Sequence, residues 1–370
     1  MNPQELFCSN PACPSRGLQG QGNITVKDSL TSRFQCKTCG KSFTARKGTV
    51  LYRLQTKEAT VLLVLALLAY GCPPQAIVRA FGLDERTVAR WQKKAGAHCQ
   101  SVHAHLVEDQ PRHLGFVQAD EIRVKFQKRL VVWMALAIQV STRLWLGGAI
   151  SVQRDKHLIV RLVAKVRACA LYGPLLLVTD GLASYASAWQ KAFRTPVFTG
   201  KKGRPQLLAW PEIIIGQVLK QYQKGHVVGV AHRLVQGTQA QMQALLPIGQ
   251  VLNTAYIERL NATFRQRLGS LVRRSRCLLR QTPTLEAGMY LVGCVYNFCT
   301  PHKSLRQALP EGRHQWVERT PAMAAEITDA VWTVAELLTY RVPPPPFVQP
   351  KPRGRPPKEA QTQKLANAPI

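Results

Sequence analysis

The chain has 370 residues, and its 50 Lys and Arg against 20 Asp and Glu give a formal net charge of +30. Such a basic chain is expected to bind a polyanion, most commonly nucleic acid. Because 46% of the residues are hydrophobic, disorder throughout the chain is excluded. The longest strongly apolar run, residues 61–69, is too short to cross a bilayer, and no signal peptide is recognisable. Membrane and secreted proteins are therefore disfavoured, and we expect a cytoplasmic protein.

Four of the ten cysteines lie within the first 40 residues, in the pairs Cys8-x4-Cys13 and Cys36-x2-Cys39. Reduced thiols are expected without a secretory signal, which disfavours disulfides. A tetrahedral Zn²⁺ ion takes four soft ligands, and closely spaced Cys pairs on tight turns supply two each. The pattern predicts a structural zinc ribbon over residues 1–52, with unligated surface thiols as the alternative.

A helical pattern follows, interrupted by Gly and Pro, and it predicts helices over residues 57–70, 74–81 and 85–97. Asp84 can cap the third helix. Two short helices joined by a Gly-containing turn, the second one basic, are typical of a helix-turn-helix. We therefore expect a DNA-binding domain over residues 53–108, although an ordinary three-helix packing unit would give the same pattern. The side chains expected to contact DNA are Arg86, Arg90, Lys93 and Lys94.

Three β-rich runs joined by short turns then predict an antiparallel meander over residues 115–126, 130–140 and 143–151. An amphipathic helix is expected over residues 155–171. The continuous apolar run 175–180 suits a buried strand, and another helix is expected over residues 182–193. This order of elements is that of the ribonuclease-H-like fold, in which the first and fourth strands are neighbours.

Two carboxylates lie at informative positions in this order. Asp120 falls within the first strand and Asp180 ends the fourth, so both could reach one point. Glu258 lies on a predicted helix, where it shares a face with Asn261 and Arg265. Hard Mg²⁺ ions take oxygen ligands, and two such ions can activate an attacking oxygen and stabilise a leaving one. Alternatively, Asp180 caps the next helix and Glu258 pairs with a nearby Arg.

Five short motifs together carry a family resemblance: Cys36-Lys37-Thr38-Cys39-Gly40-Lys41, Ala119-Asp120-Glu121, Val178-Thr179-Asp180-Gly181, Tyr256-Ile257-Glu258-Arg259-Leu260-Asn261 and the run from Tyr296 to Arg306. They resemble those of DDE-class insertion-sequence transposases, and most closely the insertion-sequence-one family. The resemblance implies a multidomain α+β protein with a zinc ribbon, a helix-turn-helix and a ribonuclease-H-like catalytic domain. That domain would span residues 109–310, with an insertion at about 195–252, and a C-terminal helical segment would follow over residues 311–342.

The resemblance further implies that Asp120, Asp180 and Glu258 hold two Mg²⁺ or Mn²⁺ ions and catalyse DNA cleavage and strand transfer. One departure concerns spacing: 77 residues lie between Asp180 and Glu258, more than in compact members of the class. Glu212 follows Asp180 after only 31 residues and is the alternative third carboxylate. We favour Glu258 because Glu212 lacks a flanking helical basic face.

By the same resemblance, Arg265 would contact the transposon end, and His302 and Asn261 would lie close to the active site. The implied partners are transposon ends and target DNA, bound by a homodimer or larger oligomer at the nucleoid. A non-catalytic DNA-binding regulator derived from a transposase is the alternative function.

The last segment, residues 343–370, is Pro-rich and polar and is expected to be disordered. Within it, the run Lys351 to Lys358 resembles an AT-hook. In such a motif Arg353 and Arg355 would enter a narrow A·T minor groove, where the negative potential is enhanced. A generic basic tail is the alternative.

Overall fold

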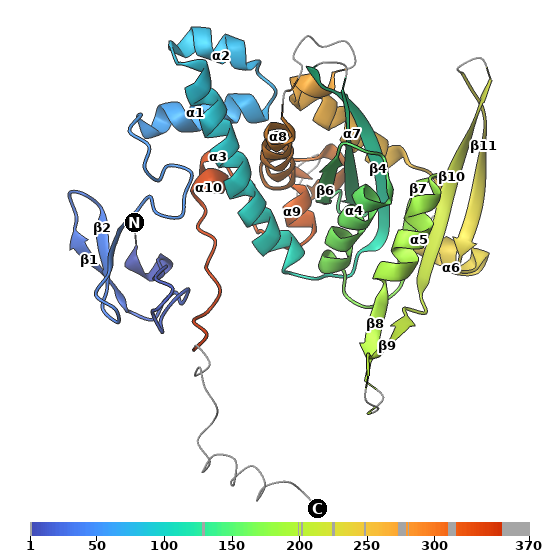
Figure 1. Cartoon of the computed structure of the whole chain (residues 1–370), viewed down its shortest axis with the longest axis horizontal. Coiled ribbons are helices and arrows are strands. Elements are labelled where there is room, and N and C mark those ends of the chain that lie inside the picture. The colour runs from blue at the N-terminus through green and yellow to red at the C-terminus, as the bar shows by residue number, and fades with distance from the viewer. Residues whose placement is uncertain are drawn as a thin grey trace, which may run out of the picture. The chain divides into compact units, whose positions relative to one another are not determined.

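A computed structural model describes residues 2–127, 130–198, 200, 203–223, 226–247, 249–272, 279, 281–309 and 316–349. The chain forms two compact units (Figure 1). The first comprises Met1–Lys47 with Pro343–Ile370, and the second is Gly48–Val342.

The first unit is built on a small antiparallel sheet that follows the short helix η1 (Pro3–Glu5): β1 (Ile24–Asp28), β2 (Arg33–Cys36) and β3 (Ser42–Thr44). Its apolar core is small, because among the described residues of this unit only Leu6, Ile24 and Phe34 are fully part of it apart from the cysteines. So little buried apolar surface rarely holds a domain of this size together without a cross-link or a metal.

The second unit begins with three helices: α1 (Glu58–Ala69), α2 (Pro74–Phe81) and α3 (Glu85–His103). They confirm the three predicted helices. The turn between α2 and α3 contains Gly82 in the left-handed conformation (φ 61°). Asp84 then caps α3, because its carboxylate accepts a hydrogen bond from the Thr87 amide (3.1 Å).

The third helix runs to His103 rather than to residue 97, since its last turns are buried against α8 (Thr282–Cys294). The two helices approach so closely that a Cβ atom on Gly96 would lie 2.3 Å from Ala287 Cα. Trp91 and Cys99 of α3 belong to the same apolar core as the main sheet. The helical segment and the sheet are therefore parts of one compact unit.

A mixed six-stranded sheet forms the centre of this unit, in the order β11-β10-β7-β4-β5-β6. Strands β4, β5 and β6 form the predicted antiparallel meander, and β7, the predicted buried strand, pairs in parallel with β4. The strands span Gly115–Lys125 (β4), Val131–Gln139 (β5), Trp145–Ser151 (β6), Leu175–Asp180 (β7), Ile213–Gln223 (β10) and His226–Gln236 (β11).

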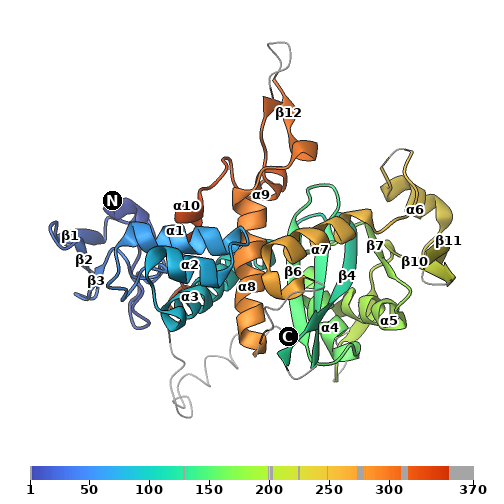
Figure 2. The ribbon, with the colours of Figure 1, turned by 90° about the horizontal axis from the view of Figure 1, so that it is seen from above.

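Helices cover both faces of the sheet. Helices α4 (Lys156–Cys169) and α5 (Ala183–Ala192) pack together on one face, and α7 (Ala255–Arg267) lies against β4 and β5 on the other (Figure 2). None of the helices in the described part of the chain combines the length and apolar character needed to cross a bilayer.

The segment expected as an insertion, about residues 195–252, contributes directly to the sheet. It begins with the small hairpin β8 (Arg194–Val197) and β9 (Gln206–Ala209), continues through β10 and β11, and ends after α6 (Gln239–Leu245). The first part of β10, from Ile213 to Val218, pairs in parallel with the whole of β7. This segment therefore extends the sheet beside Asp180.

Helices at the C-terminal end of the unit pack against the segment that directly follows α8 and against α1 and α3. After η5 (Val295–Cys299) come the strands β12 (Gln307–Ala308) and β13 (Trp316–Val317) and the short helices α9 (Pro321–Ala324) and α10 (Val334–Thr339). Leu337 and Leu338 of α10 are buried in the main core. Residues 350–370, including the AT-hook-like run with Arg353 and Arg355, lie outside the described residues.

Asn297 closes the outer edge of the sheet. Its side chain accepts a hydrogen bond from the Trp145 amide and donates one to the Trp145 carbonyl (both 2.9 Å), so it takes the place of a further strand beside β6. Asn297→Ala would leave both buried backbone groups unsatisfied. We expect the free energy of unfolding to fall by about 2–6 kcal/mol, since each of the two groups costs about 1–3 kcal/mol.

Urea denaturation would measure this loss. Gln243→Ala, at an exposed position of α6, is the control and should change stability by less than about 0.5 kcal/mol. Equal stability of the two variants would contradict the bridging role of Asn297.

Candidate metal and catalytic sites

The first unit brings its four cysteines together at one point. The Sγ atoms of Cys8 and Cys39 are 3.6 Å apart, and those of Cys13 and Cys36 are 3.8 Å apart. All four sulfurs lie within 4.8 Å of one another. Sulfurs bound to a tetrahedral ion at about 2.3 Å are separated by about 3.8 Å. The cysteines can therefore hold a metal ion without rearrangement.

The second candidate site is a group of three carboxylates on the main sheet. Oxygens of Asp120, Glu121 and Asp180 lie within 4.8 Å of one another. The parallel pairing of β4 with β7 explains why: it places Asp120, in the middle of β4, beside the end of β7, where Asp180 lies. Glu121 follows Asp120 on β4, and its carboxylate also lies within this distance of the two aspartates.

Each of the two predicted aspartates is oriented by neighbours. Asn261 of α7 donates a hydrogen bond from Nδ2 to Asp120 Oδ2 (2.8 Å), so Asn261 lies beside Asp120. Asp180 accepts one hydrogen bond from the Leu182 amide (3.1 Å), at the start of α5. Helix α5 has no side-chain cap and its N-cap residue is Leu182, so the alternative role of Asp180 as the cap of this helix is wrong.

Glu258 lies next to this cluster but outside it. Its carboxylate forms an ion pair with Lys220 of β10 and accepts a hydrogen bond from the Thr254 hydroxyl (2.9 Å). Burial opposes ionisation of Glu258, but the hydrogen bonds from Lys220 and Thr254 lower its pKa overall. The negative charge of Glu258 nevertheless contributes to the raised pKa of Asp120, so the two groups are close.

Glu212 occupies the opposite end of the sheet. Its carbonyl accepts a hydrogen bond from the Leu175 amide (3.0 Å) at the start of β7, whereas Asp180 ends that strand. Five residues of extended chain separate these ends by roughly 16 Å. Glu212 is exposed there and is therefore not a geometrically suitable partner for Asp180.

The carboxylate cluster carries unfavourable electrostatic energy. Burial, together with the neighbouring charges of Glu121, Asp180 and Glu258, raises the pKa of Asp120 to about 7. Burial also raises the pKa of Glu121, although Tyr185 and Arg154 oppose the shift. A cation among these oxygens would relieve the repulsion, so the group is suited to hold a hard metal ion.

This electrostatic energy predicts a pH dependence of stability. An unfolded Asp ionises near pH 3.9, whereas folded Asp120 keeps its proton to about pH 7. Between these values the folded state binds more protons, so without added Mg²⁺ or Mn²⁺ the protein should lose stability as the pH rises from about 4 to 7. Denaturation at pH 5 and pH 7.5 would measure the change. Asp120→Asn should show a smaller pH dependence; an undiminished one would contradict the assignment.

The sequence does not predict that Glu121 and Arg154 take part in this site. Glu121 is visible in the Ala119-Asp120-Glu121 motif, but only the packing of α5 shows that its side chain also turns toward Asp180. Arg154, just before α4, donates hydrogen bonds to both Glu121 and Asp180. Arg154 carries no recognisable sequence signal, since its position depends on the turn between β6 and α4.

The predicted DNA-contacting residues of α3 divide into two groups. Arg86, Arg90 and Lys93 are exposed. Lys94 is half-buried, its amine donates a hydrogen bond to the Tyr52 carbonyl, and burial lowers its pKa. Lys94 therefore forms a contact within the fold, which cannot be recognised from its position among basic residues in the sequence.

His302 packs edge-on against Tyr296, with ring centroids 4.7 Å apart. Burial and the nearby charges of Arg259, Arg143 and Arg267 lower its pKa to about 4, so the ring is neutral at pH 7.

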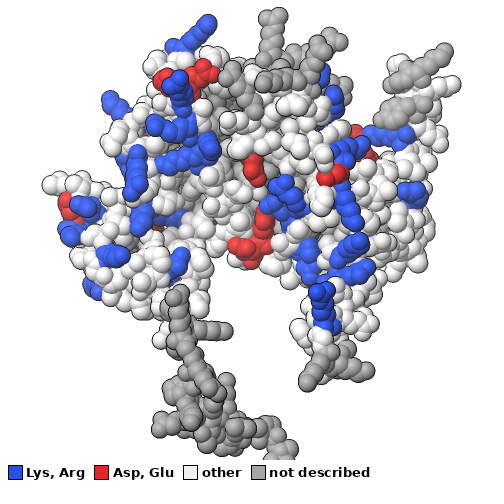
Figure 3. Space-filling view, in the orientation of Figure 1, with Lys and Arg blue, Asp and Glu red and all other residues white. Residues whose placement is uncertain are grey.

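Arg265 lies half-buried in the last turn of α7. On the face drawn in Figure 3, Lys and Arg outnumber the acidic side chains, which gather in a few small patches.

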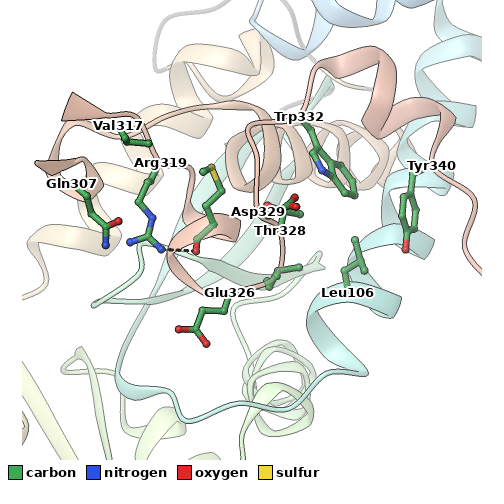
Figure 4. A pocket seen from close by; sticks show the side chains of 11 residues that line it. Leu106, Gln307, Val317, Arg319, Glu326, Thr328, Asp329, Trp332 and Tyr340 are labelled. Atoms are coloured by element: carbon green, nitrogen blue, oxygen red, sulfur yellow. Dashed lines mark hydrogen bonds between the residues drawn. The ribbon is translucent and has the colours of Figure 1, made fainter. Parts of the chain in front are cut away.

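A cavity of about 810 Å³ lies among the C-terminal elements (Figure 4). Arg319 lines it and donates a hydrogen bond to the Met323 carbonyl (2.7 Å). Trp332 and Tyr340 line another side and stack with ring centroids 5.2 Å apart. None of the predicted catalytic residues lines this cavity.

No protein-family model matches the chain, and no curated protein gives a match. A functional assignment therefore depends on the residues described above and on their geometry.

Proposed function

We propose that the chain is a DDE-type DNA transposase that binds the terminal inverted repeats of an insertion sequence, cleaves DNA and transfers the strand. This proposal is supported mainly by the short distance between the carboxylates of Asp120 and Asp180. The two residues are distant in sequence but adjacent on parallel strands of one sheet. Three antiparallel strands followed by parallel β7 and β10 support a ribonuclease-H-like catalytic domain.

The donor set of this site fits Mg²⁺ or Mn²⁺. All three clustered side chains offer carboxylate oxygens, which hard cations prefer. Asp120 and Asp180 would hold the ions. Glu258 would also bind them once its ion pair with Lys220 is broken. When bound, two ions supply the Lewis acidity that activates an attacking oxygen and stabilises a leaving one.

The protein's own side chains would prepare this site. Asn261 fixes the orientation of the Asp120 carboxylate, and Lys220 keeps Glu258 ionised beside it. The nucleophile would be water in the first step and the freed 3′-OH in the second, so no covalent bond between protein and DNA is required. Asp120, Asp180 and Glu258 would thus act as metal ligands, and no side chain would act as the nucleophile.

DNA recognition would involve other parts of the chain. We propose that the four-cysteine site holds Zn²⁺ and keeps a ribbon in shape for DNA binding. Arg86, Arg90 and Lys93 on α3 are exposed and would contact the terminal repeats. Arg265 would lie near the transposon end. Synapsis of two ends would require a dimer or larger assembly, and contacts to the DNA backbone would make the affinity strongly salt-dependent.

One observation favours the alternative, a non-catalytic DNA-binding regulator. Each acidic group of the site has a basic or amide partner within the protein: Lys220 for Glu258, Arg154 for Asp180 and Glu121, and Asn261 for Asp120. Such a network could be purely structural.

A cleavage assay separates these functions. Full-length protein would be mixed with labelled DNA carrying the element's native terminal repeats, with Mg²⁺, with Mn²⁺ or with neither. We expect a nick that exposes the 3′ end of the element only when a divalent ion is added. Specific binding to the repeats without any cleavage would instead identify the regulator.

A further inference from the structure

Arg154 occupies the position between two carboxylates of the cluster. Its Nε and Nη2 atoms donate to Glu121 Oε2 (2.9 and 2.7 Å), and Nη2 also donates to Asp180 Oδ2 (3.1 Å). The guanidinium lies 5.1 Å from the centre of the Trp133 ring, which adds a cation–π contact. The next residue, Asp155, caps α4 through the Leu158 amide (3.0 Å), so the backbone that carries Arg154 is anchored.

The two contacts of Arg154 differ in strength. The Glu121 side chain is completely buried, and Arg154 approaches it with two donors. The Asp180 side chain is 40% exposed and receives a single, longer hydrogen bond. Buried charge-assisted pairs with two donors are the stronger ones, whereas an exposed contact exchanges readily with solvent. Arg154 can therefore release Asp180 while it stays bound to Glu121.

We propose that Arg154 is an internal counter-cation, a positioning residue that competes with the divalent ion for Asp180. This inference rests on the metal site of the proposed function and goes beyond it. Without a metal ion, Arg154 balances the charge of the cluster and keeps Asp180 beside Asp120. A metal ion that binds Asp180 displaces the guanidinium from that oxygen. Glu121 is then the permanent anchor of Arg154 rather than a ligand of the metal.

The test is the affinity for Mn²⁺, measured by electron paramagnetic resonance on full-length protein. Arg154→Gln alone would leave Glu121 buried and unpaired, which can unfold the protein. The double variant Glu121→Gln/Arg154→Gln replaces the ion pair by two amides that can bond to each other. If Arg154 competes for Asp180, this variant should bind Mn²⁺ about tenfold more tightly than the wild type.

Two further variants sharpen the result. Glu121→Gln alone removes the charged partner that anchors Arg154. The guanidinium would then pair with Asp180 alone, so Mn²⁺ binding should weaken severalfold. Arg161→Gln removes the same charge from α4, where the guanidinium hydrogen-bonds the Ile150 carbonyl, and should leave the affinity within about twofold. Thermal unfolding of each variant would confirm that it is folded.

An affinity of the double variant that equals or falls below that of the wild type would overturn the proposal, as would a lack of Mn²⁺ binding by both proteins. A weaker affinity in both Glu121 variants would identify Glu121 as a metal ligand instead. Failure of the proposed function is distinguishable, because it would appear as Mn²⁺ binding by the wild type without cleavage of the terminal repeats.

Discussion

Asp180→Asn is expected to reduce cleavage of the terminal repeats by on the order of 10³-fold, which corresponds to about 4 kcal/mol of transition-state stabilisation. The amide retains the size of the side chain and can still accept the hydrogen bond from the Leu182 amide. It lacks the negative charge that a divalent ion needs from its ligand. Binding of the protein to the repeats should remain within about threefold of the wild type, since Asp180 lies away from the exposed basic residues of α3.

The rate of nicking in Mg²⁺ and the affinity for the repeats would be measured side by side. Glu212→Gln is the matched control: it removes an acid at the other end of β7 and should keep at least half of the wild-type rate. A rate for Asp180→Asn close to that of this control would exclude a catalytic role for the carboxylate cluster.

Loss of the metal from the first unit should have the second large effect. The apolar core around Leu6, Ile24 and Phe34 is small, so we expect most of the folding free energy of this unit to come from a metal ion bound by the four thiolates. Structural zinc supplies about 10–16 kcal/mol in comparable small sites. Cys36→Ser is therefore expected to unfold residues 2–47 and weaken binding to the terminal repeats at least about tenfold.

Limited proteolysis would detect this change as rapid cleavage within residues 2–47, while fragments from Gly48–Val342 persist. Cys72→Ser is the control, because Cys72 lies after α1 and outside the four-cysteine group. Measured zinc content should fall for Cys36→Ser alone. A ribbon that resists protease after loss of its metal would show that the cysteines are not what stabilises it.

The sequence is sufficient to predict the features that depend on local patterns. Period-two alternation and a continuous apolar run locate β4, β5, β6 and β7, and the cysteine spacing leads directly to the four-thiol site. The pairing of Asp120 with Asp180 also follows, because it needs only the knowledge that the first and fourth strands are adjacent. The strands depend on local patterns, whereas the pairing of Asp120 with Asp180 depends on the strand order of the expected fold.

Features that depend on several distant segments could not be predicted in this way. Arg154 reaches Glu121 only because the turn before α4 lies beside the end of β7. The partnership of Glu258 with Lys220 depends on β10, a strand within the segment that the sequence marks as an insertion. Lys94 looks like a DNA-binding residue until the position of Tyr52 is known.

We propose that this chain joins DNA strands at a carboxylate site. The covalent joining of labelled terminal-repeat DNA to a target plasmid by the wild-type protein in Mg²⁺, with the junctions sequenced, tests this directly. We expect products in which the 3′ end of the element is joined to target DNA. Cleavage that yields only free ends, or binding that yields no cut at all, would contradict it.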